Sequence, residues 1–156
     1  MKRSGFIILA IIAVLVIWGI SAQRGLVSQD ENVKKSWNNV QSEYQKRSDL
    51  VGQLVETVKG VANFEQKTLT DVINARSKAT SINVNANDLS PEKVAEFQKA
   101  QEELKGSLSR LLIVAEQYPQ LKATESFMKL QGQLEGIEND VKTSRNAFNE
   151  AVNTYN

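Results

Sequence analysis

Histidine and cysteine are both absent from this chain of 156 residues, and only two prolines occur. The absence of histidine and cysteine excludes zinc sites of the usual kind, thiol catalysis, haem ligation by histidine and every catalytic triad that relies on histidine. The sequence also lacks a glycine-rich phosphate-binding loop. We therefore expect a protein without enzyme activity, with no catalytic residues, no cofactor and no bound metal.

An excess of charge of either sign is also missing. The chain carries 19 lysines and arginines against 18 aspartates and glutamates, which gives a net charge of +1 at pH 7. General nucleic-acid binding needs a basic surface, because the phosphate backbone supplies much of the affinity. We therefore expect no nucleic-acid partner.

One long apolar run is present near the N-terminus. Residues 5–22 carry no charge and are mostly aliphatic. As a helix they would span about 27 Å, close to the thickness of the hydrocarbon core of a bilayer. A cleaved signal peptide is the alternative, but the length of the run and the poor cleavage sequence near Ser21 favour a retained transmembrane anchor.

Flanking charge sets the expected orientation of this anchor. Lys2 and Arg3 precede the run, whereas Arg24 alone lies just after it. Positive charge is enriched on the cytoplasmic side, so we expect a cytoplasmic N-terminus and an extracytoplasmic domain. The predicted parts are a short cytoplasmic N-terminus at 1–5, a transmembrane anchor at 6–22, a juxtamembrane linker at 23–32 and one helical-bundle domain at 33–156.

Apolar residues after the anchor recur at alternating spacings of three and four, which is the heptad pattern of packed helices. The pattern fills three segments, at about 33–79, 90–118 and 124–155. Short connections between long helices favour antiparallel neighbours. We predict an all-α fold in which one transmembrane helix precedes an elongated antiparallel up-and-down bundle of three long helices. A break at Gly52 or Gly60 would make the number four.

The ends of these segments carry recognisable signals. A polar, asparagine-rich stretch at 80–89 predicts a loop, and Ser90 before Pro91 predicts an N-cap with proline in the first helical position. Tyr118 followed by Pro119 predicts the end of the second segment. Trp37 and other large residues of the seam are expected in the core.

Several strings along the domain resemble the LemA family, and together they cover nearly the whole chain. They include Leu54-Val55-Glu56-Thr57-Val58-Lys59-Gly60, Tyr118-Pro119-Gln120-Leu121-Lys122-Ala123, Leu134-Glu135-Gly136-Ile137-Glu138-Asn139 and Phe148-Asn149-Glu150-Ala151-Val152. The chain departs from the family pattern at Gly52, where relatives usually have proline. A less rigid helical turn is therefore expected at that position.

The resemblance implies a single-pass protein of the bacterial inner (plasma) membrane, with no enzyme activity. Its expected partners are membrane lipid and other membrane or periplasmic proteins, a membrane protease among them. The main hypothesis is a membrane-tethered interaction or scaffold module in envelope protein quality control or complex assembly. Two alternatives stay open: a self-assembling structural membrane protein that forms homo-oligomers, and an extracytoplasmic ligand-sensing bundle.

Charged residues on or near the seams are the candidate functional residues. Arg47 and Glu65 fall on seam positions, where an unpaired charge is costly. We expect Arg47 to pair with Asp49 or Glu56, and Glu138 to pair with Arg145. Such pairs would either fix the register of the bundle or line a charged groove that captures a partner peptide. The candidate structural or interaction residues are Arg47, Asp49, Glu56, Lys59, Glu65, Arg76, Glu138 and Arg145.

Overall fold

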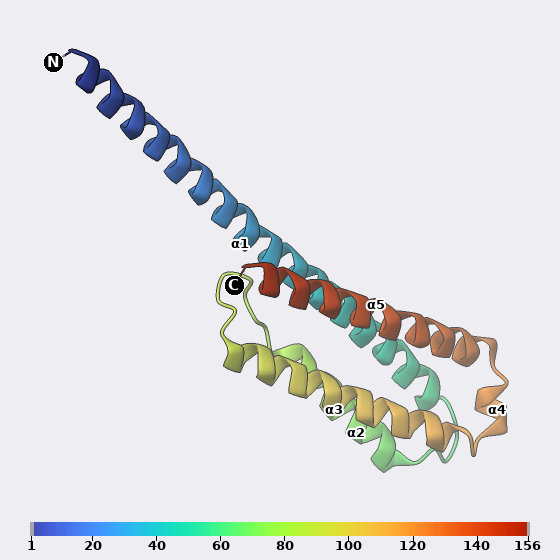
Figure 1. The fold of residues 1–156 in the computed structure, drawn as a ribbon. Coiled ribbons are helices and arrows are strands. Elements are labelled where there is room, and N and C mark those ends of the chain that lie inside the picture. Colours follow the sequence, from blue (N-terminus) through green and yellow to red (C-terminus); the bar gives the residue numbers. More distant parts are fainter. Residues whose placement is uncertain (1, 156) are drawn as a thin grey trace.

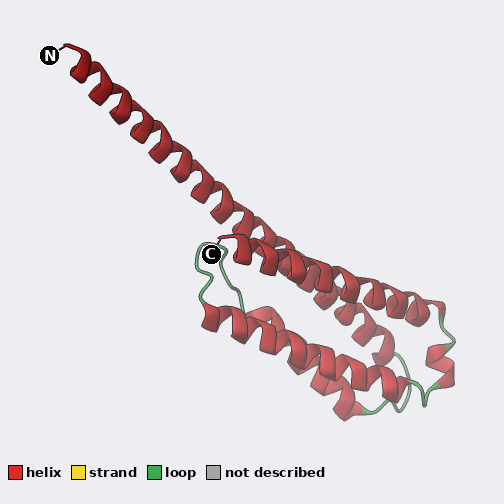
Figure 2. Ribbon diagram, in the orientation of Figure 1, coloured by secondary structure: helices red, strands yellow, loops and turns green. Residues whose placement is uncertain are grey.

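The computed structural model describes residues 2–155, with side chains described for residues 11–18 and 27–155. Within this part of the chain every element of secondary structure is a helix, which confirms the predicted all-α class (Figure 2). The helices are α1 (Lys2–Lys59), α2 (Gln66–Ser81), α3 (Pro91–Ala115), α4 (Pro119–Lys122) and α5 (Glu125–Tyr155).

The four long helices alternate in direction and form an up-and-down bundle, while the N-terminal part of α1 extends beyond it as a single helix (Figure 1). Helix α1 packs chiefly against α5, and α2 packs chiefly against α3. A smaller interface joins α1 to α2. Of the two predicted forms of the bundle, the one with four long helices is therefore adopted.

The break in the first predicted segment lies at Gly60 and not at Gly52. Helix α1 ends at Lys59, and residues 60–65 form a turn in which Asn63 has a φ of 61°. This left-handed conformation is one that asparagine tolerates better than most residues. The side chain of Phe64 is buried in the core, and Tyr118 donates a hydrogen bond to the carbonyl of Asn63 at 2.9 Å.

At Gly52 the helix continues, and the missing side chain makes room for α2. A Cβ atom at this position would lie 3.0 Å from Nη2 of Arg76. The Nε of Arg76 donates a hydrogen bond to the carbonyl of Ser48 at 2.8 Å. Glycine therefore lets a guanidinium of α2 lie directly against α1, where the resemblance suggested only a less rigid turn.

Two clusters of buried apolar side chains fill the bundle. The distal core lies toward α4 and is mostly aliphatic. Its larger members are Val51, Leu54, Val58, Leu69, Val72, Leu104, Leu108, Leu111, Leu121, Phe127, Leu130, Leu134 and Ile137. The proximal core lies where α1 leaves the bundle and is rich in aromatic rings. It contains Trp37, Val40, Tyr44, Val84, Phe97, Val141 and Phe148.

Trp37 holds the proximal core together. Its ring centroid lies 5.4 Å from that of Phe97 and 5.1 Å from that of Phe148. Its Nε1 donates a hydrogen bond to the carbonyl of Val84 at 2.9 Å, and Gln41 Nε2 donates to the same oxygen at 2.9 Å. These two donors fix the connection at 82–90 against α1.

The start of α3 follows the predicted capping pattern. The Ser90 hydroxyl accepts a hydrogen bond from the backbone N–H of Lys93 at 3.3 Å, and Pro91 is the first helical residue. The predicted N-cap is therefore confirmed, and the loop before it runs from residue 82 to residue 90.

No helix is both long enough and apolar enough to cross a bilayer among the residues that the structure describes. Of the predicted transmembrane anchor at 6–22, the side chains of residues 6–10 and 19–22 lie outside the described residues. The anchor therefore stays a prediction. The apolar side chains described at 11–18 are exposed, and the predicted linker at 23–32 is helical, as part of α1.

Candidate functional site: a groove between α3 and α5

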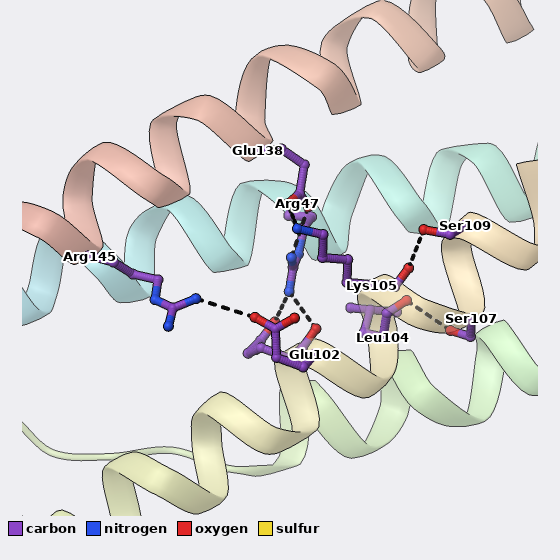
Figure 3. A network of polar contacts seen from close by, with 9 residues as sticks. Arg47, Glu102, Leu104, Lys105, Ser107, Ser109, Glu138 and Arg145 are labelled. Carbon is purple, nitrogen blue, oxygen red and sulfur yellow. Dashed lines mark hydrogen bonds and ion pairs between the residues drawn. The ribbon is translucent and has the colours of Figure 1, made fainter.

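A buried arginine occupies the centre of the bundle. The side chain of Arg47, on α1, is only 2 % exposed. Its Nη1 donates a hydrogen bond to Glu138 of α5 at 2.9 Å, and its Nη2 donates to the carbonyl and side-chain oxygens of Gln101 of α3 at 2.9 and 2.7 Å. Figure 3 shows the guanidinium pointing from α1 toward α3 and α5.

This polar network reaches all four long helices. Gln101 Nε2 donates a hydrogen bond to the carbonyl of Ala79 at the end of α2, at 3.3 Å. The guanidinium carbon of Arg47 lies 4.8 Å from the ring centroid of Tyr44, within the range of cation–π attraction. Along α1, Arg47 stands between Tyr44 of the proximal core and Val51 of the distal core. The network therefore separates the two cores and ties the helices in one register.

Glu138 is shared by two cations. Lys105 Nζ lies 3.1 Å from its Oε2, and Arg47 binds its other oxygen. Partial burial acts to raise the pKa of Glu138, but the hydrogen bonds and charges of Arg47 and Lys105 outweigh this and hold the pKa below its usual 4.5. Glu138 is therefore ionised at neutral pH.

Tyr44 has the opposite shift. Burial raises the pKa of its hydroxyl above the usual 10.0, and the charges of Arg145 and Arg47 offset this only in part. Tyr44 is therefore neutral at physiological pH and presents a hydroxyl group beside the ion pairs.

An open seam runs between α3 and α5, because α3 packs chiefly on α2 whereas α5 packs chiefly on α1. Two cavities lie along this seam, and we call them together the α3–α5 groove. Asn149 borders both. On each helix the lining residues recur every three or four positions, so they share one face.

The first cavity, the basic section of the groove, has a volume of about 340 Å³. Four cationic side chains and two carboxylates line it, which leaves two positive charges in excess. Tyr44 and Val141 also line it, together with three asparagines of α5. The charged residues are Arg47, Glu102, Lys105, Glu138, Lys142 and Arg145.

The second cavity, the apolar section, has a volume of about 790 Å³ and lies at the proximal end of the groove. Residues of α1, the 82–90 connection, α3 and α5 surround it. Its apolar lining consists of Val33, Ala86, Leu89, Pro91, Val94, Ala95, Phe148 and Val152, with Tyr155 at the end of α5.

The structure brings together three of the predicted residues, Arg47, Glu138 and Arg145, in the basic section, although both expected pairings are wrong. Arg47 pairs with Glu138 and not with Asp49 or Glu56, while Arg145 pairs with Glu102 of α3 at 3.3 Å. Arg47 and Asp49 are two positions apart on one helix, so their side chains point in different directions. Arg47 and Glu56 are nine positions apart, which places their side chains about 13 Å apart along the helix axis.

The other predicted residues lie away from the groove. Asp49 accepts a hydrogen bond from Gln45 on the exposed side of α1. Glu56 and Lys59 form a surface ion pair at 2.7 Å near the end of that helix. Arg76 packs at the interface of α1 with α2, as described above, so these residues do not form one site.

Glu65 was expected on the seam, and this expectation is wrong. The residue is exposed and precedes the first turn of α2, where its carboxylate accepts a hydrogen bond from Thr68 Oγ1 at 3.0 Å. The turn that begins at Gly60 resets the helical register. The regular spacing that continues past Val58 therefore does not describe one continuous face.

Sequence reasoning did not select Gln101, Glu102, Lys105 or Lys142 as candidates. Gln101 carried a usable signal, because a polar residue on an otherwise apolar seam needs a partner. The other three side chains are exposed. Nothing in their local sequence distinguishes them from other charged residues on a solvated helix face.

Comparison with known proteins identifies the family of this chain. The model of the LemA family matches residues 36–156. The protein LemA of Metamycoplasma hominis is 22% identical over 137 residues, covering 88% of this chain and 59% of that protein. The chain thus spans about three fifths of the length of this relative. Because the family match extends over most of the chain, including every helix of the bundle after α1, the chain belongs to the LemA family.

Proposed function

We propose that this chain is a membrane-tethered, non-enzymatic interaction module that docks another protein of the bacterial envelope. Its N-terminus lies in the cytoplasm, residues 6–22 anchor it in the inner membrane, and the bundle stands outside. The proposal includes a role in envelope protein quality control or complex assembly.

The observation that carries this proposal is the continuity of α1. This helix of 58 residues joins the apolar run directly to a bundle whose α3–α5 seam is open. From residue 22 to residue 33, where the packed part begins, the helix rises by about 16 Å. A partner would therefore be held at a short and constant distance from the membrane surface.

The titratable groups of the groove support a non-enzymatic role. General acid–base catalysis works best with a pKa near the working pH. The pKa of Glu138 is lowered and that of Tyr44 is raised, so both move away from neutrality. Glu138 instead keeps a fixed charge, and Tyr44 keeps a neutral hydroxyl group.

Crosslinking in native membranes tests this function. The full-length chain should be recovered covalently joined to one or a few envelope proteins, each of which recovers this chain in the reciprocal experiment. Recovery of the chain alone, or only of its own copies, under several crosslinkers would contradict docking of another protein.

Membrane attachment needs its own test. After an alkaline carbonate wash, the intact chain should stay in the membrane pellet. A soluble product trimmed near Ser21 would show that the apolar run is removed as a signal peptide.

A further inference from the structure

We propose that the α3–α5 groove docks an amphipathic helix of the partner protein, with acidic side chains over the basic section and apolar side chains in the apolar section. This inference rests on the proposed function and adds to it the binding surface and the chemistry of the partner. Three features of the groove support it.

The apolar section is only partly covered by the chain's own side chains. Val33, Leu89, Val94 and Val152 pack against the proximal core but stay partly exposed, and a cavity of about 790 Å³ opens beside them. Apolar surface of this kind gains free energy when a second apolar surface removes it from water. The side chains of a docked helix would complete the packing that the proximal core lacks.

The basic section favours a carboxylate-bearing partner. Arg145 bridges to Glu102 across the groove at 3.3 Å, and both side chains are exposed, at 38% and 58%. Exposed ion pairs of this type contribute little and exchange readily. Lys142, one turn before Arg145 on the same face, forms no ion pair with any side chain that the structure describes. An incoming carboxylate would therefore find one cation unpaired and a second one easily released.

The shape of the groove fits a helix. Its two walls are antiparallel helices, and their lining residues recur at helical spacing. Ridges of a third helix pack into such a groove, as amphipathic helices do in other proteins. From Glu138 to Tyr155 the α5 wall extends about 26 Å, which matches a partner helix of about 17 residues.

Site-specific photo-crosslinking in the full-length chain in its native membrane tests this inference. A benzophenone amino acid replaces Asn146 in the basic section, Gln98 in the apolar section, or, as the control, Asn74 on the exposed side of α2. Mass spectrometry then identifies the crosslinked peptide. We expect Asn146 and Gln98 to label one segment of the same protein, acidic where it meets Asn146 and apolar where it meets Gln98, and Asn74 not to label it.

Charge reversal provides the matched control. Lys142→Glu with Arg145→Glu should reduce the yield from Asn146 at least tenfold. Lys67→Glu with Lys129→Glu reverses two exposed lysines outside the groove and should leave the yield unchanged. Thermal unfolding of both double variants should stay close to that of the wild type, because all four side chains lie at or near the surface.

The outcomes separate this inference from the proposed function. Labelling of a second copy of this chain, labelling of a neutral or basic segment, or equal yields from both double variants would overturn the amphipathic helix and its charge pattern. A partner labelled from Asn74 but not from the groove would overturn the groove while docking stood. No labelled protein from any of the three positions would overturn the groove, and the crosslinking test of the proposed function would then decide whether the chain docks another protein.

Discussion

The distal and proximal cores are packed in different ways. In the distal core Val51, Leu54 and Val58 are fully buried, and aliphatic side chains from all sides close the bundle. In the proximal core aromatic rings fill the centre, but valines at its border, such as Val94 and Val152, stay partly exposed. Partly exposed apolar residues border the distal core as well, such as Leu50 and Val61. The two halves therefore differ in their aromatic content and in the cavity of about 790 Å³ beside the proximal core, which we propose a partner helix fills.

The Arg47 network marks the boundary between these two halves. Arg47 connects residues of α3 and α5, and Glu138 in turn faces the basic section of the groove. A buried ion pair is weak evidence for net stabilisation, but removal of one partner is costly. Loss of Arg47 should therefore destabilise the boundary at which the two cores meet.

The largest effect is expected for Arg47→Ala. Truncation leaves the side-chain oxygen of Gln101 without its donor and leaves Glu138 with Lys105 as its one remaining cation. Loss of one member of a buried pair costs about 3–5 kcal/mol, and the partial exposure of Glu138 places the expected loss near about 3 kcal/mol. Urea unfolding of the full chain in detergent measures it. Lys59→Ala, which breaks an exposed pair with Glu56, is the control and should cost under about 1 kcal/mol.

A pair of identical substitutions compares the distal core with the border of the apolar section. Val58→Ala in the distal core should lower the free energy of unfolding by about 2 kcal/mol, because the removed methyl groups leave a cavity. Val152→Ala at the border of the apolar section should lower it by well under about 1 kcal/mol, since water already reaches that side chain. Equal losses at the two valines would show that the border of the apolar section is packed as closely as the distal core.

Trp37→Phe tests how the proximal core holds the 82–90 connection. The variant keeps an aromatic ring but loses the indole donor to the Val84 carbonyl, which Gln41 still satisfies. We expect a loss of about 1 kcal/mol and faster proteolytic cleavage at 82–90. Trp18→Phe, at an exposed position outside the bundle, should change neither quantity. Unchanged cleavage in Trp37→Phe would contradict the role of this hydrogen bond.

The smallest effect is expected for the pH dependence of the unfolding free energy that Glu138 contributes at the boundary between the cores. Because the pKa of Glu138 is lower in the folded chain than in the unfolded chain, its contribution to stability is present above the unfolded value of about 4.5. That contribution is lost as the pH falls through the folded pKa. Glu138→Gln should therefore be less stable than the wild type at pH 7, and the two unfolding free energies should converge as the pH falls below the folded pKa. Parallel curves from pH 7 to pH 3 would argue against the ion pair.

Local signals predicted much of the fold. The Ser90 cap, the end of α3 near Pro119 and the buried faces of α1, α3 and α5 were all readable, because each depends on residues a few positions apart. Gly60 was one of two alternatives for the break in the first segment. Gly52 was the wrong one, because its glycine accommodates Arg76 and does not interrupt the helix.

The candidate site was less readable. Arg47 was identified as a charge that needs a partner, but its partner Glu138 lies 91 positions away. Glu65 was placed on a seam because the heptad spacing happened to continue across the turn. Lys142 and Glu102 look like ordinary exposed residues until α3 and α5 are placed on either side of an open seam.

The order of residues alone determined the helices, their caps and their buried faces, since hydrogen bonding within a helix and apolar periodicity are local properties. Only the tertiary structure decided which charges meet, that Arg47 separates two cores, and that α3 and α5 stay apart to leave a groove. The physical reason is that ion pairing and groove width depend on the distance between helices, which side-chain packing across the whole bundle sets.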